Sequence, residues 1–541
     1  MNRRLTKTVQ IGNVQMGGDN PIRVQSMLNT FTTDTEACVA QAIEVIEAGG
    51  EIVRLTTQGV KEAANMANIK AGLLAKGYTT PLVADVHFNP NAATEAALHI
   101  EKVRINPGNY AATYDEIRAK FIPFLALCKQ HGTAIRIGVN HGSLGARMMD
   151  KYGDTPEGMT ESCLEFLRIC QEQDFNNVVI SVKASNTRVM IHTVRQMARR
   201  MDAEGLNFPI HLGVTEAGEG EDGRIKSAVG IGTLLLEGIG DTIRVSLSED
   251  PANEIPVAKQ LVNLAEKALY STSSNSGPLI SLASPRLSSS KLDSALGSHK
   301  DSTSSGTEFE PNWFNGETYT RRQSTPVGEI GGGALPVVWN ASMPVPQGVT
   351  LMVLDHDNPL EQGRYLFGQM HQEGNQSPVI VYKKYTDISL QELQLTAAAH
   401  LGNFFIDGLA DGICIDAPHL PAADVEALGY SILQAARARM SKTEYISCPS
   451  CGRTLFDIQT AIARIKAKTS HLNTLKIGIM GCIVNGPGEM ADADYGYVGA
   501  GRGKISLYKG QTCIEKNIPE DEAVDRLIDL IKANGDWFEA E

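Results

Sequence analysis

Short apolar segments rich in β-branched residues alternate with longer stretches of helical periodicity over residues 1–265. Stretches such as 35–48 and 155–173 repeat apolar residues three and four positions apart, which predicts helices. Eight strand-helix repeats favour a (β/α)8 TIM barrel, although the pattern alone leaves an open doubly wound sheet possible. The predicted strands are 22–27, 52–57, 82–87, 103–106, 134–139, 178–183, 210–215 and 242–247.

The pattern changes after the eighth repeat. A stretch rich in Ser begins near residue 271 and cannot bury enough apolar surface to fold, so we predict a linker over 266–334. Residues 335–440 predict a small inserted α/β module, with strands at 349–354, 378–382 and 412–415 and helices at 390–401 and 422–439. Residues 441–541 predict an α+β domain, with a strand at 476–480, a Gly-rich hairpin at 495–507 and a final amphipathic helix at 520–533.

Composition excludes several classes of protein. The chain has 541 residues, enough for two or three domains, and 62 Asp and Glu outnumber 49 Lys and Arg to give a net charge of −13. No apolar run reaches the roughly 20 residues of a membrane-spanning helix, and the basic N-terminus lacks the apolar core of a secretory signal. We therefore expect a cytoplasmic protein that contacts neither membrane nor nucleic acid.

Cations recur near the carboxyl ends of the predicted strands, where a TIM barrel builds its active site. A single Arg there is usually solvated or salt-bridged, but five cations in apolar segments are hard to attribute to surface solvation. Without matching carboxylates, such cations predict a multiply charged anion as ligand, and a diphosphate fits well. The cations are Arg54, Arg104, Arg136, Lys183 and Arg244, with Asn140 and Ser246 as neutral donors at corresponding positions.

Three acidic or imidazole side chains also lie at strand ends. Glu216 is either a salt-bridge partner of an Arg or a proton donor or acceptor, because burial and nearby charges shift a carboxyl pKa. Asp85 and His87 stand two positions apart and so face the same side of a strand. They could bind a divalent metal, but no third ligand is evident, and we favour a role in orienting substrate.

Nine Cys in a chain without a secretory signal argue against a disulfide framework and indicate metal or redox chemistry. Cys448 and Cys451 form a C-x-x-C turn, Cys482 follows a predicted strand, and Glu489 comes seven residues later. Three thiolates and a carboxylate favour a 4Fe-4S cluster with one differently ligated iron. A structural zinc site and a redox dithiol stay open as alternatives, and the other six Cys are expected to be structural.

Several long motifs resemble the 4-hydroxy-3-methylbut-2-en-1-yl diphosphate synthase family. They are spread over the first 265 and the last hundred residues, so the resemblance covers both predicted outer domains. The motifs are VQSM (24–27), PLVADVHF (81–88), VRINPGN (103–109), IGVNHGSL (137–144), LGVTEAG (212–218), YISCPSCGRT (445–454) and GCIVNGPGE (481–489).

The resemblance implies a TIM barrel and a C-terminal domain similar to the cluster domain of sulfite and nitrite reductases. It implies two-electron reductive ring opening and dehydration of 2-C-methyl-D-erythritol 2,4-cyclodiphosphate in isoprenoid biosynthesis, with flavodoxin or ferredoxin as electron donor. Glu216 would be the acid, and Cys448, Cys451, Cys482 and Glu489 would ligate the [4Fe-4S] cluster. The cyclic diphosphate would be held by the five cations, Asn140 and Ser246, and Asp85 and His87 would belong to the same site.

The inserted module resembles the extra domain of the three-domain form of this family, although it is shorter. In two-domain members a homodimer brings the C-terminal domain of one subunit over the barrel of the other, so we expect the insert to permit closure within one chain. Two other functions stay open. One is a metal-dependent barrel lyase or aldolase that uses Asp85 and His87, with a structural zinc; the other is a non-enzymatic iron-sulfur sensor.

Overall fold

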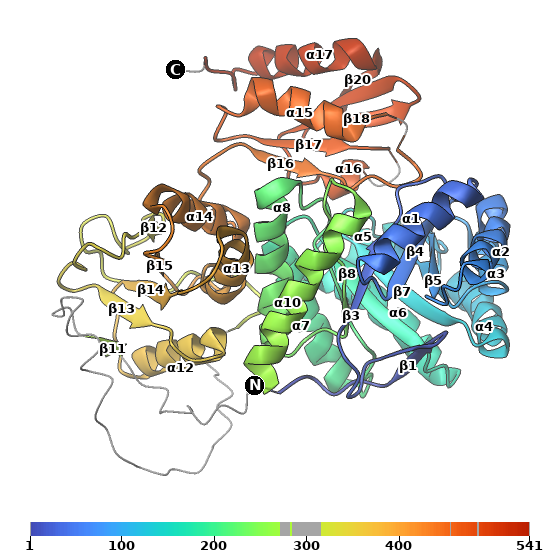
Figure 1. Ribbon diagram of the computed structural model, residues 1–541, viewed down its shortest axis with the longest axis horizontal. Coiled ribbons are helices and arrows are strands. Elements are labelled where there is room, and N and C mark those ends of the chain that lie inside the picture. Colours follow the sequence, from blue (N-terminus) through green and yellow to red (C-terminus); the bar gives the residue numbers. More distant parts are fainter. Residues whose placement is uncertain (1, 271–281, 284–314, 455, 484–485, 540–541) are drawn as a thin grey trace.

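The computed structural model describes residues 2–270, 282–283, 315–454, 456–483 and 486–539. Within this part of the chain there are three units, which we call the barrel (2–270), the inserted module (315–440) and the C-terminal domain (441–539). Figure 1 shows the C-terminal domain lying across one end of the barrel and the inserted module lying beside the barrel. Most of the predicted Ser-rich linker lies outside the described residues.

Eight parallel strands form the barrel, as the repeat pattern predicts. They pair in the order β8-β7-β6-β5-β4-β3-β10-β9, and a parallel bridge between Ile180 and Ile210 closes the ring. The last two strands are shorter than predicted because the chain leaves the ladder early to line the barrel mouth. The strands are β3 (Arg23–Met27), β4 (Ile52–Thr57), β5 (Leu82–Val86), β6 (Lys102–Ile105), β7 (Ala134–Asn140), β8 (Val178–Lys183), β9 (His211–Leu212) and β10 (Thr242–Ile243).

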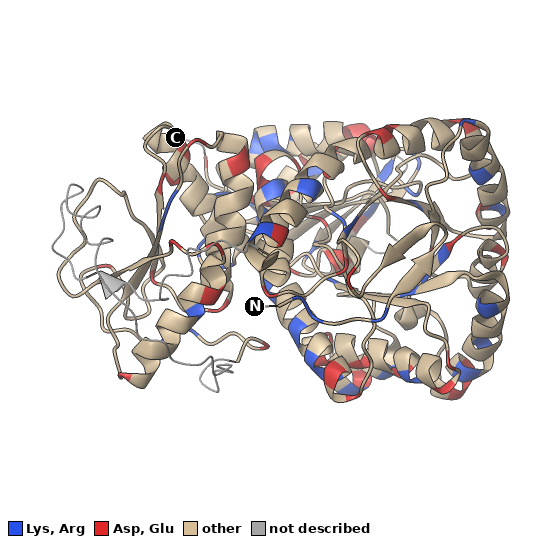
Figure 2. Ribbon diagram, turned by 60° about the horizontal axis from the view of Figure 1, so that its bottom comes forward, with Lys and Arg blue, Asp and Glu red and all other residues tan. Residues whose placement is uncertain are grey.

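Helices surround the barrel and begin at the polar caps that the sequence supplies. Asp34 caps the first and Thr155 caps the sixth, each accepting a backbone N–H bond. Figure 2 shows charged residues of both signs spread along these helices. The helices are α1 (Thr35–Glu47), α2 (Val60–Ala75), α3 (Pro90–Ala97), α4 (Tyr114–His131), α5 (Ala146–Tyr152), α6 (Pro156–Glu172), α7 (Thr187–Ala203), α8 (Gly220–Ser227), α9 (Thr233–Leu236) and α10 (Glu254–Tyr270), with the π-turn η2 (Ala228–Gly232) and the 3-10 turns η1 (Pro107–Asn109) and η3 (Pro251–Asn253).

A hairpin that the sequence analysis did not predict closes the far end of the barrel. Its strands are β1 (Val9–Ile11) and β2 (Val14–Met16), paired antiparallel. Three of its side chains, Val9, Ile11 and Met16, are fully buried against the first residues of the barrel strands. The barrel is thus sealed at the end opposite the strand carboxyl termini, which leaves one open mouth for chemistry.

The inserted module is a five-stranded α/β sheet of order β11-β13-β14-β15-β12. The structure places the limits of the linker differently from the predicted 266–334, because α10 continues to Tyr270 and Arg322 already pairs with Asp411 of the module. Helix α12 is unpredicted; Asn358 caps it and Pro359 begins it. The elements are β11 (Leu282–Ala283), β12 (Val337–Val338), β13 (Thr350–Val353), α12 (Pro359–Gln372), β14 (Val379–Lys384), α13 (Leu390–Ile406), β15 (Gly412–Asp416) and α14 (Ala422–Ala435).

Barrel and inserted module share one continuous apolar core. Helix α13 packs directly on the π-turn η2, and a Cβ added to Gly232 would lie 2.5 Å from the Cβ of Ala399. A buried ionic network also joins the two units: Arg195 and Arg364 each pair with Glu237 of the barrel and Asp407 of the module. The module is therefore fixed to the barrel flank by close packing as well as by charge.

The C-terminal domain combines parallel and antiparallel pairing in the order β16-β17-β18-β19-β20. Helices α15 and α17 cover one face through the apolar core around Ile479 and Leu527. Helix α15 begins at Ile458, and its N-cap Asp457 accepts backbone N–H bonds from Gln459 and Thr460. The elements are β16 (Glu444–Ser447), α15 (Ile458–Thr469), β17 (Lys476–Met480), α16 (Gly486–Glu489), β18 (Tyr495–Gly501), β19 (Lys504–Lys509), β20 (Thr512–Pro519) and α17 (Glu520–Ala533).

The packing of α13 on the π-turn leads to a testable prediction. Gly232→Ala should lower the free energy of unfolding by about 1–3 kcal/mol, because the new methyl overpacks the contact with Ala399. Ala is otherwise the better helix former by about 1 kcal/mol. The double variant Gly232→Ala with Ala399→Gly restores the space and should recover part of the loss in urea unfolding. A single variant more stable than the parent chain would contradict this account of the interface.

Candidate active site at the barrel mouth

One cavity at the barrel mouth is lined by every residue that the sequence analysis assigned to the site. The barrel supplies the cations, the neutral donors and Glu216, and the C-terminal domain supplies the three Cys and Glu489 from the opposite side. The two halves are thus brought together in one place, although they lie more than 200 residues apart in the chain. The predicted residues are Arg54, Asp85, His87, Arg104, Arg136, Asn140, Lys183, Glu216, Arg244, Ser246, Cys448, Cys451, Cys482 and Glu489.

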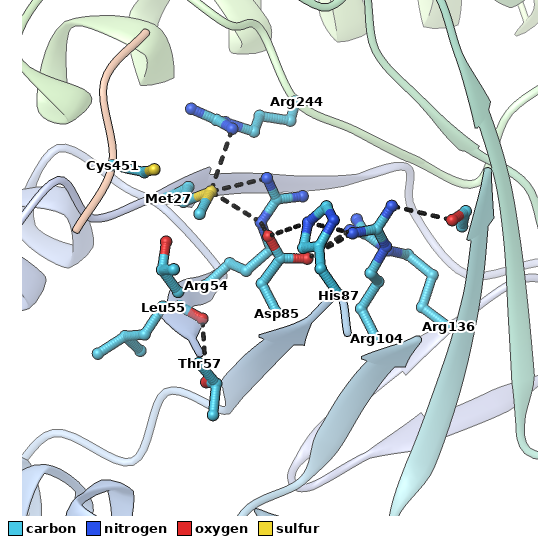
Figure 3. A network of polar contacts seen from close by, with 12 residues as sticks. Met27, Arg54, Leu55, Thr57, Asp85, His87, Arg104, Arg136, Arg244 and Cys451 are labelled. Atoms are coloured by element: carbon cyan, nitrogen blue, oxygen red, sulfur yellow. Dashed lines mark hydrogen bonds and ion pairs between the residues drawn. The ribbon is translucent and has the colours of Figure 1, made fainter. Parts of the chain in front are cut away.

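Asp85 lies at the centre of the cations (Figure 3). Its carboxylate oxygens are 3.2 Å from the Arg104 guanidinium and 3.9 Å from those of Arg54 and Arg136, and His87 Nε2 is 3.2 Å away. Burial alone would raise the pKa of Asp85, but the charges of Arg54 and Arg104 and the hydrogen bond with His87 outweigh it and hold the pKa well below its usual range. Asp85 is therefore ionised and serves as a shared counterion.

This geometry leaves little support for a metal ion on Asp85 and His87. His87 Nε2 also contacts the Arg104 guanidinium, and burial together with that positive charge lowers the pKa of His87 to about 3. Three guanidinium groups within 4 Å of Asp85 repel a divalent cation and suit an anion instead.

A second carboxylate corrects the expectation that the cations lack matching acids. Glu254, the first residue of α10, accepts hydrogen bonds of 2.9 and 3.1 Å from Arg244 and one of 2.7 Å from Ser26. Met27 is a further residue that the sequence analysis missed, and its thioether sulfur lies 2.7 Å from Arg54 Nη2. Glu254 could not be assigned from spacing, because it begins a helix and returns to the barrel from outside the strand pattern.

Basic side chains nevertheless outnumber acidic ones around the cavity. Six Lys and Arg line it, against Asp85, Glu216 and Glu489 in the lining and Glu254 behind Arg244. Burial and the charges of Arg54 and Arg104 lower the pKa of Arg136 well below its usual value. Nε and Nη1 of Arg136 have no hydrogen-bond partner among the described residues. A buried guanidinium with unused donors and repelled by its neighbours is the arrangement that a multiply charged anion relieves.

Glu216 lies where the barrel and the C-terminal domain meet. Its backbone is left-handed, with φ of 49°, in a loop that leaves β9 early. Burial, and then the negative charge of Glu489, raises the pKa of Glu216 well above its usual value. Glu489 in turn accepts a 2.7 Å hydrogen bond from Asn140 Nδ2. Glu216 therefore keeps its proton to a higher pH than a free glutamate does, which suits a proton donor.

The three Cys converge on the cavity from two loops of the C-terminal domain. Cys448 and Cys451 follow β16, and Cys482 follows β17. Donors already point at the sulfurs: the Gly481 N–H lies 3.4 Å from Cys448 Sγ, and Arg453 Nε lies 3.4 Å from Cys451 Sγ. Such donors stabilise thiolates and the negative charge of a thiolate-bound centre.

Arg453 is a site residue that the sequence analysis did not select. It lines the cavity two residues after Cys451, and negative charge on Cys451 and Asp85 raises its pKa although burial opposes this. Its position within the C-x-x-C-x-R motif was the available signal. The side chain contributes positive charge to the cysteine side of the cavity.

The arrangement of the side chains bears on the structural zinc site that the sequence left open. Four ligands around one zinc at about 2.3 Å hold sulfurs about 3.8 Å apart. In the described part of the chain, no group of three His, Cys, Asp or Glu side chains is arranged to hold one metal ion. The three thiols and Glu489 instead all line the one cavity at the barrel mouth.

Comparison with known proteins agrees with the geometry. Residues 6–259 match the family described as GcpE TIM-barrel domain, and residues 444–533 match the GcpE protein C-terminal domain. A 4-hydroxy-3-methylbut-2-en-1-yl diphosphate synthase (flavodoxin) of Bacteroides fragilis is 50% identical over 614 residues, covering 99% of this chain and 97% of the relative. The one from Porphyromonas gingivalis is 47% identical, with coverage of 99% and 98%.

The chain belongs to the 4-hydroxy-3-methylbut-2-en-1-yl diphosphate synthase family. The alignment with the Bacteroides fragilis synthase spans more positions than this chain has residues, so that relative carries residues which this chain lacks. In the described part of this family member, no helix has the length and apolar character needed to cross a membrane.

In this synthase-family chain, a buried ionic junction connects all three units. Glu444, the first residue of β16, is 3.0 Å from Lys226 of the barrel and also pairs with Arg437 of the inserted module. Burial alone would raise the pKa of Glu444, but Lys226 and Arg437 lower it to about 2. The junction therefore holds the C-terminal domain, and with it Cys448, at a set position over the barrel.

Glu444→Gln should destabilise the family member in a pH-dependent way. Because the folded pKa of about 2 lies below the ordinary value of 4.5, the carboxylate's contribution is complete above about pH 5 and is lost as the pH falls toward 2. At pH 7 the variant should lose about 3 kcal/mol in urea unfolding, since two buried cations lose their partner. The difference in the free energy of unfolding between the variant and the parent chain should be smaller at pH 3.5. The exposed Glu426→Gln is the control, and an equal difference at both pH values would refute this role of Glu444.

Proposed function

We propose that this chain catalyses the reductive ring opening and dehydration of 2-C-methyl-D-erythritol 2,4-cyclodiphosphate to 4-hydroxy-3-methylbut-2-en-1-yl diphosphate. The observation that carries the proposal is the single cavity in which a surplus of buried cations faces three thiols. The cations suit a cyclic diphosphate, and the thiols suit a centre that delivers electrons. Family membership and the relatives' name support the same reaction.

The barrel residues bind and polarise the substrate. Arg54, Arg104, Arg136, Lys183 and Arg244 donate to the phosphate oxygens, with Asn140 and Ser246 as neutral donors. Negative charge develops when the bond between the tertiary carbon and the phosphate oxygen breaks. Cations that are already fixed in place by Asp85 and Glu254 stabilise that charge without reorganising.

Glu216 supplies the proton for the second bond cleavage. The hydroxyl group of the substrate leaves as water when it receives this proton, and the carbon-carbon double bond forms as two electrons enter. Burial and the neighbouring Glu489, which raise the pKa of Glu216, support this role. Closure of the C-terminal domain excludes bulk water from this step.

Cys448, Cys451, Cys482 and Glu489 would hold a [4Fe-4S] cluster. When bound, the cluster supplies the two electrons one at a time, and flavodoxin, which appears in the relatives' names, is the proposed donor. Asn140 and the Ser185 hydroxyl bind Glu489 at its carboxylate and its backbone carbonyl, at 2.7 and 2.9 Å. The barrel thus holds the carboxylate ligand directly and links it to the substrate side.

Anaerobic purification tests this proposal. The protein should contain iron and sulfide, and reduced protein should convert the cyclodiphosphate to product. Arg136→Met should keep its iron and sulfide but bind substrate at least about tenfold more weakly, because a charge-assisted contact to phosphate is lost. The exposed Lys504→Met is the charge-matched control. A colourless protein with one tightly bound zinc, or unchanged substrate binding by Arg136→Met, would refute the proposal.

The C-terminal domain can cover either its own barrel or that of a second chain. We propose closure within one chain, as in the structure, where Glu489 contacts Asn140 of its own barrel. Mixing a Glu216→Ala chain with a Cys482→Ser chain should therefore recover no activity. Each variant alone and a mixture with half the amount of parent protein serve as controls. Recovered activity would show that a homodimer exchanges its C-terminal domains and would overturn the within-chain arrangement.

A further inference from the structure

A second cavity, of about 450 Å³, lies where the barrel, the inserted module and the C-terminal domain meet. Its wall comes from the first turns of α7, from the segment after α14, and from Lys476 at the start of β17. None of the residues assigned to the barrel mouth lines it. The volume is within the range of small-molecule sites.

Four cations line this cavity, and the described lining includes no Asp or Glu. Arg437 is neutralised by Glu444. The other three, Arg188, Arg439 and Lys476, have no carboxylate oxygen within 4 Å of their charged groups in the described part of the chain. The charges of Asp407 and Glu444 still act on Arg188 and Lys476, from beyond that distance. In a chain with a net charge of −13, three such cations around one cavity are an anion-attracting arrangement.

The arginines are fixed in place rather than free in solvent. Arg188 Nη2 donates to the carbonyl of Ala436 at 3.0 Å, and its guanidinium stacks 3.6 Å from the centre of the Tyr319 ring. Its Nε has no hydrogen-bond partner among the described residues. Arg439 Nη1 donates to the Pro336 carbonyl at 3.0 Å. Their remaining N–H groups are thus available without further ordering, which favours binding.

A buried histidine, His192, also faces a ligand-sized space without a hydrogen-bond partner for one ring nitrogen in the described chain. It lines the cavity, is only 5% exposed, and its Nε2 has no hydrogen-bond partner within the described structure. Burial, and then the charge of Arg195, lowers the pKa of His192 to about 4, so the ring is neutral near pH 7 and can donate from Nε2. A buried donor without a partner is costly, and a bound oxygen would satisfy it.

We propose that this cavity binds a small organic phosphate or diphosphate that carries an apolar group. The phosphate would lie among Arg188, Arg439, Lys476 and His192. Apolar side chains at the rim, Leu335 at 59% and Met440 at 36% exposure, would cover the apolar group. Since the binding residues come from all three units, the ligand favours the arrangement in which the C-terminal domain is docked on the barrel. The site is separate from the proposed catalytic one.

Equilibrium dialysis with inorganic diphosphate and n-pentyl diphosphate tests the proposal on the full chain. The parent protein should bind two molecules of either probe. Arg136→Met, which disables the barrel mouth, should bind one. Adding Arg439→Gln and Lys476→Gln to that variant should weaken the remaining site by about tenfold or more, since two charged donors are lost. Removing Arg502 and Lys504, exposed cations of the C-terminal domain, in the same way is the matched control.

Several outcomes would overturn the inference. One is that Arg136→Met binds neither probe, and another is that the Arg502 and Lys504 changes weaken its binding as much as the Arg439 and Lys476 changes do. If n-pentyl diphosphate binds no more tightly than inorganic diphosphate, the apolar part of the ligand assignment is wrong. Thermal unfolding without probe checks that each variant is folded, and Lys476→Gln alone replaces the double change if it is not. Failure of catalysis with the second site intact would affect only the proposed function.

Discussion

The buried carboxylate of Asp85 makes the cationic end of the barrel possible. Three guanidinium groups converge on it within 4 Å, a geometry that their mutual repulsion would otherwise oppose. One acid cannot neutralise all of them, and Glu254 satisfies only Arg244. The fold therefore keeps the cations fixed and yet incompletely neutralised, and this unsatisfied charge suits the cyclic diphosphate that we propose as substrate.

The same end of the barrel must also admit the C-terminal domain at very short range. Gly142 of the barrel and Gly488 beside Glu489 pack backbone to backbone: a Cβ on Gly142 would lie 2.4 Å from the Gly488 Cα. No side chain fits between them, so Asn140 can reach the Glu489 carboxylate directly. The two glycines are thus a condition for joining the cationic and the cysteine halves, which explains their place in two distant motifs.

The repeat pattern and the residues within it predicted the barrel, because each strand is an apolar run that carries its functional side chain at the end. Cys448, Cys451 and Cys482 could also be predicted from the sequence, since cysteines at turns are rare. Glu254 and the packing of the N-terminal hairpin could not be predicted, because each depends on a contact between segments far apart in the chain. Arg453 did have a local signal, the C-x-x-C-x-R motif, but it was not selected. The cavity around His192 depends on three units packing together, and no local pattern indicates it.

The inserted module packs against both other units and helps to hold them in place. Its helix α13 shares a core with the barrel, and its Arg437 reaches the first strand of the C-terminal domain through Glu444. Arg188 binds the carbonyls at the end of α14, while the neighbouring Asn186 and Ser185 contact Asp492 and the Glu489 carbonyl. One barrel loop, immediately after the substrate-side Lys183, therefore touches both other units. Because contacts with the inserted module hold this segment, the position of Glu489 over the barrel depends on the insert as well as on the two domains that form the site.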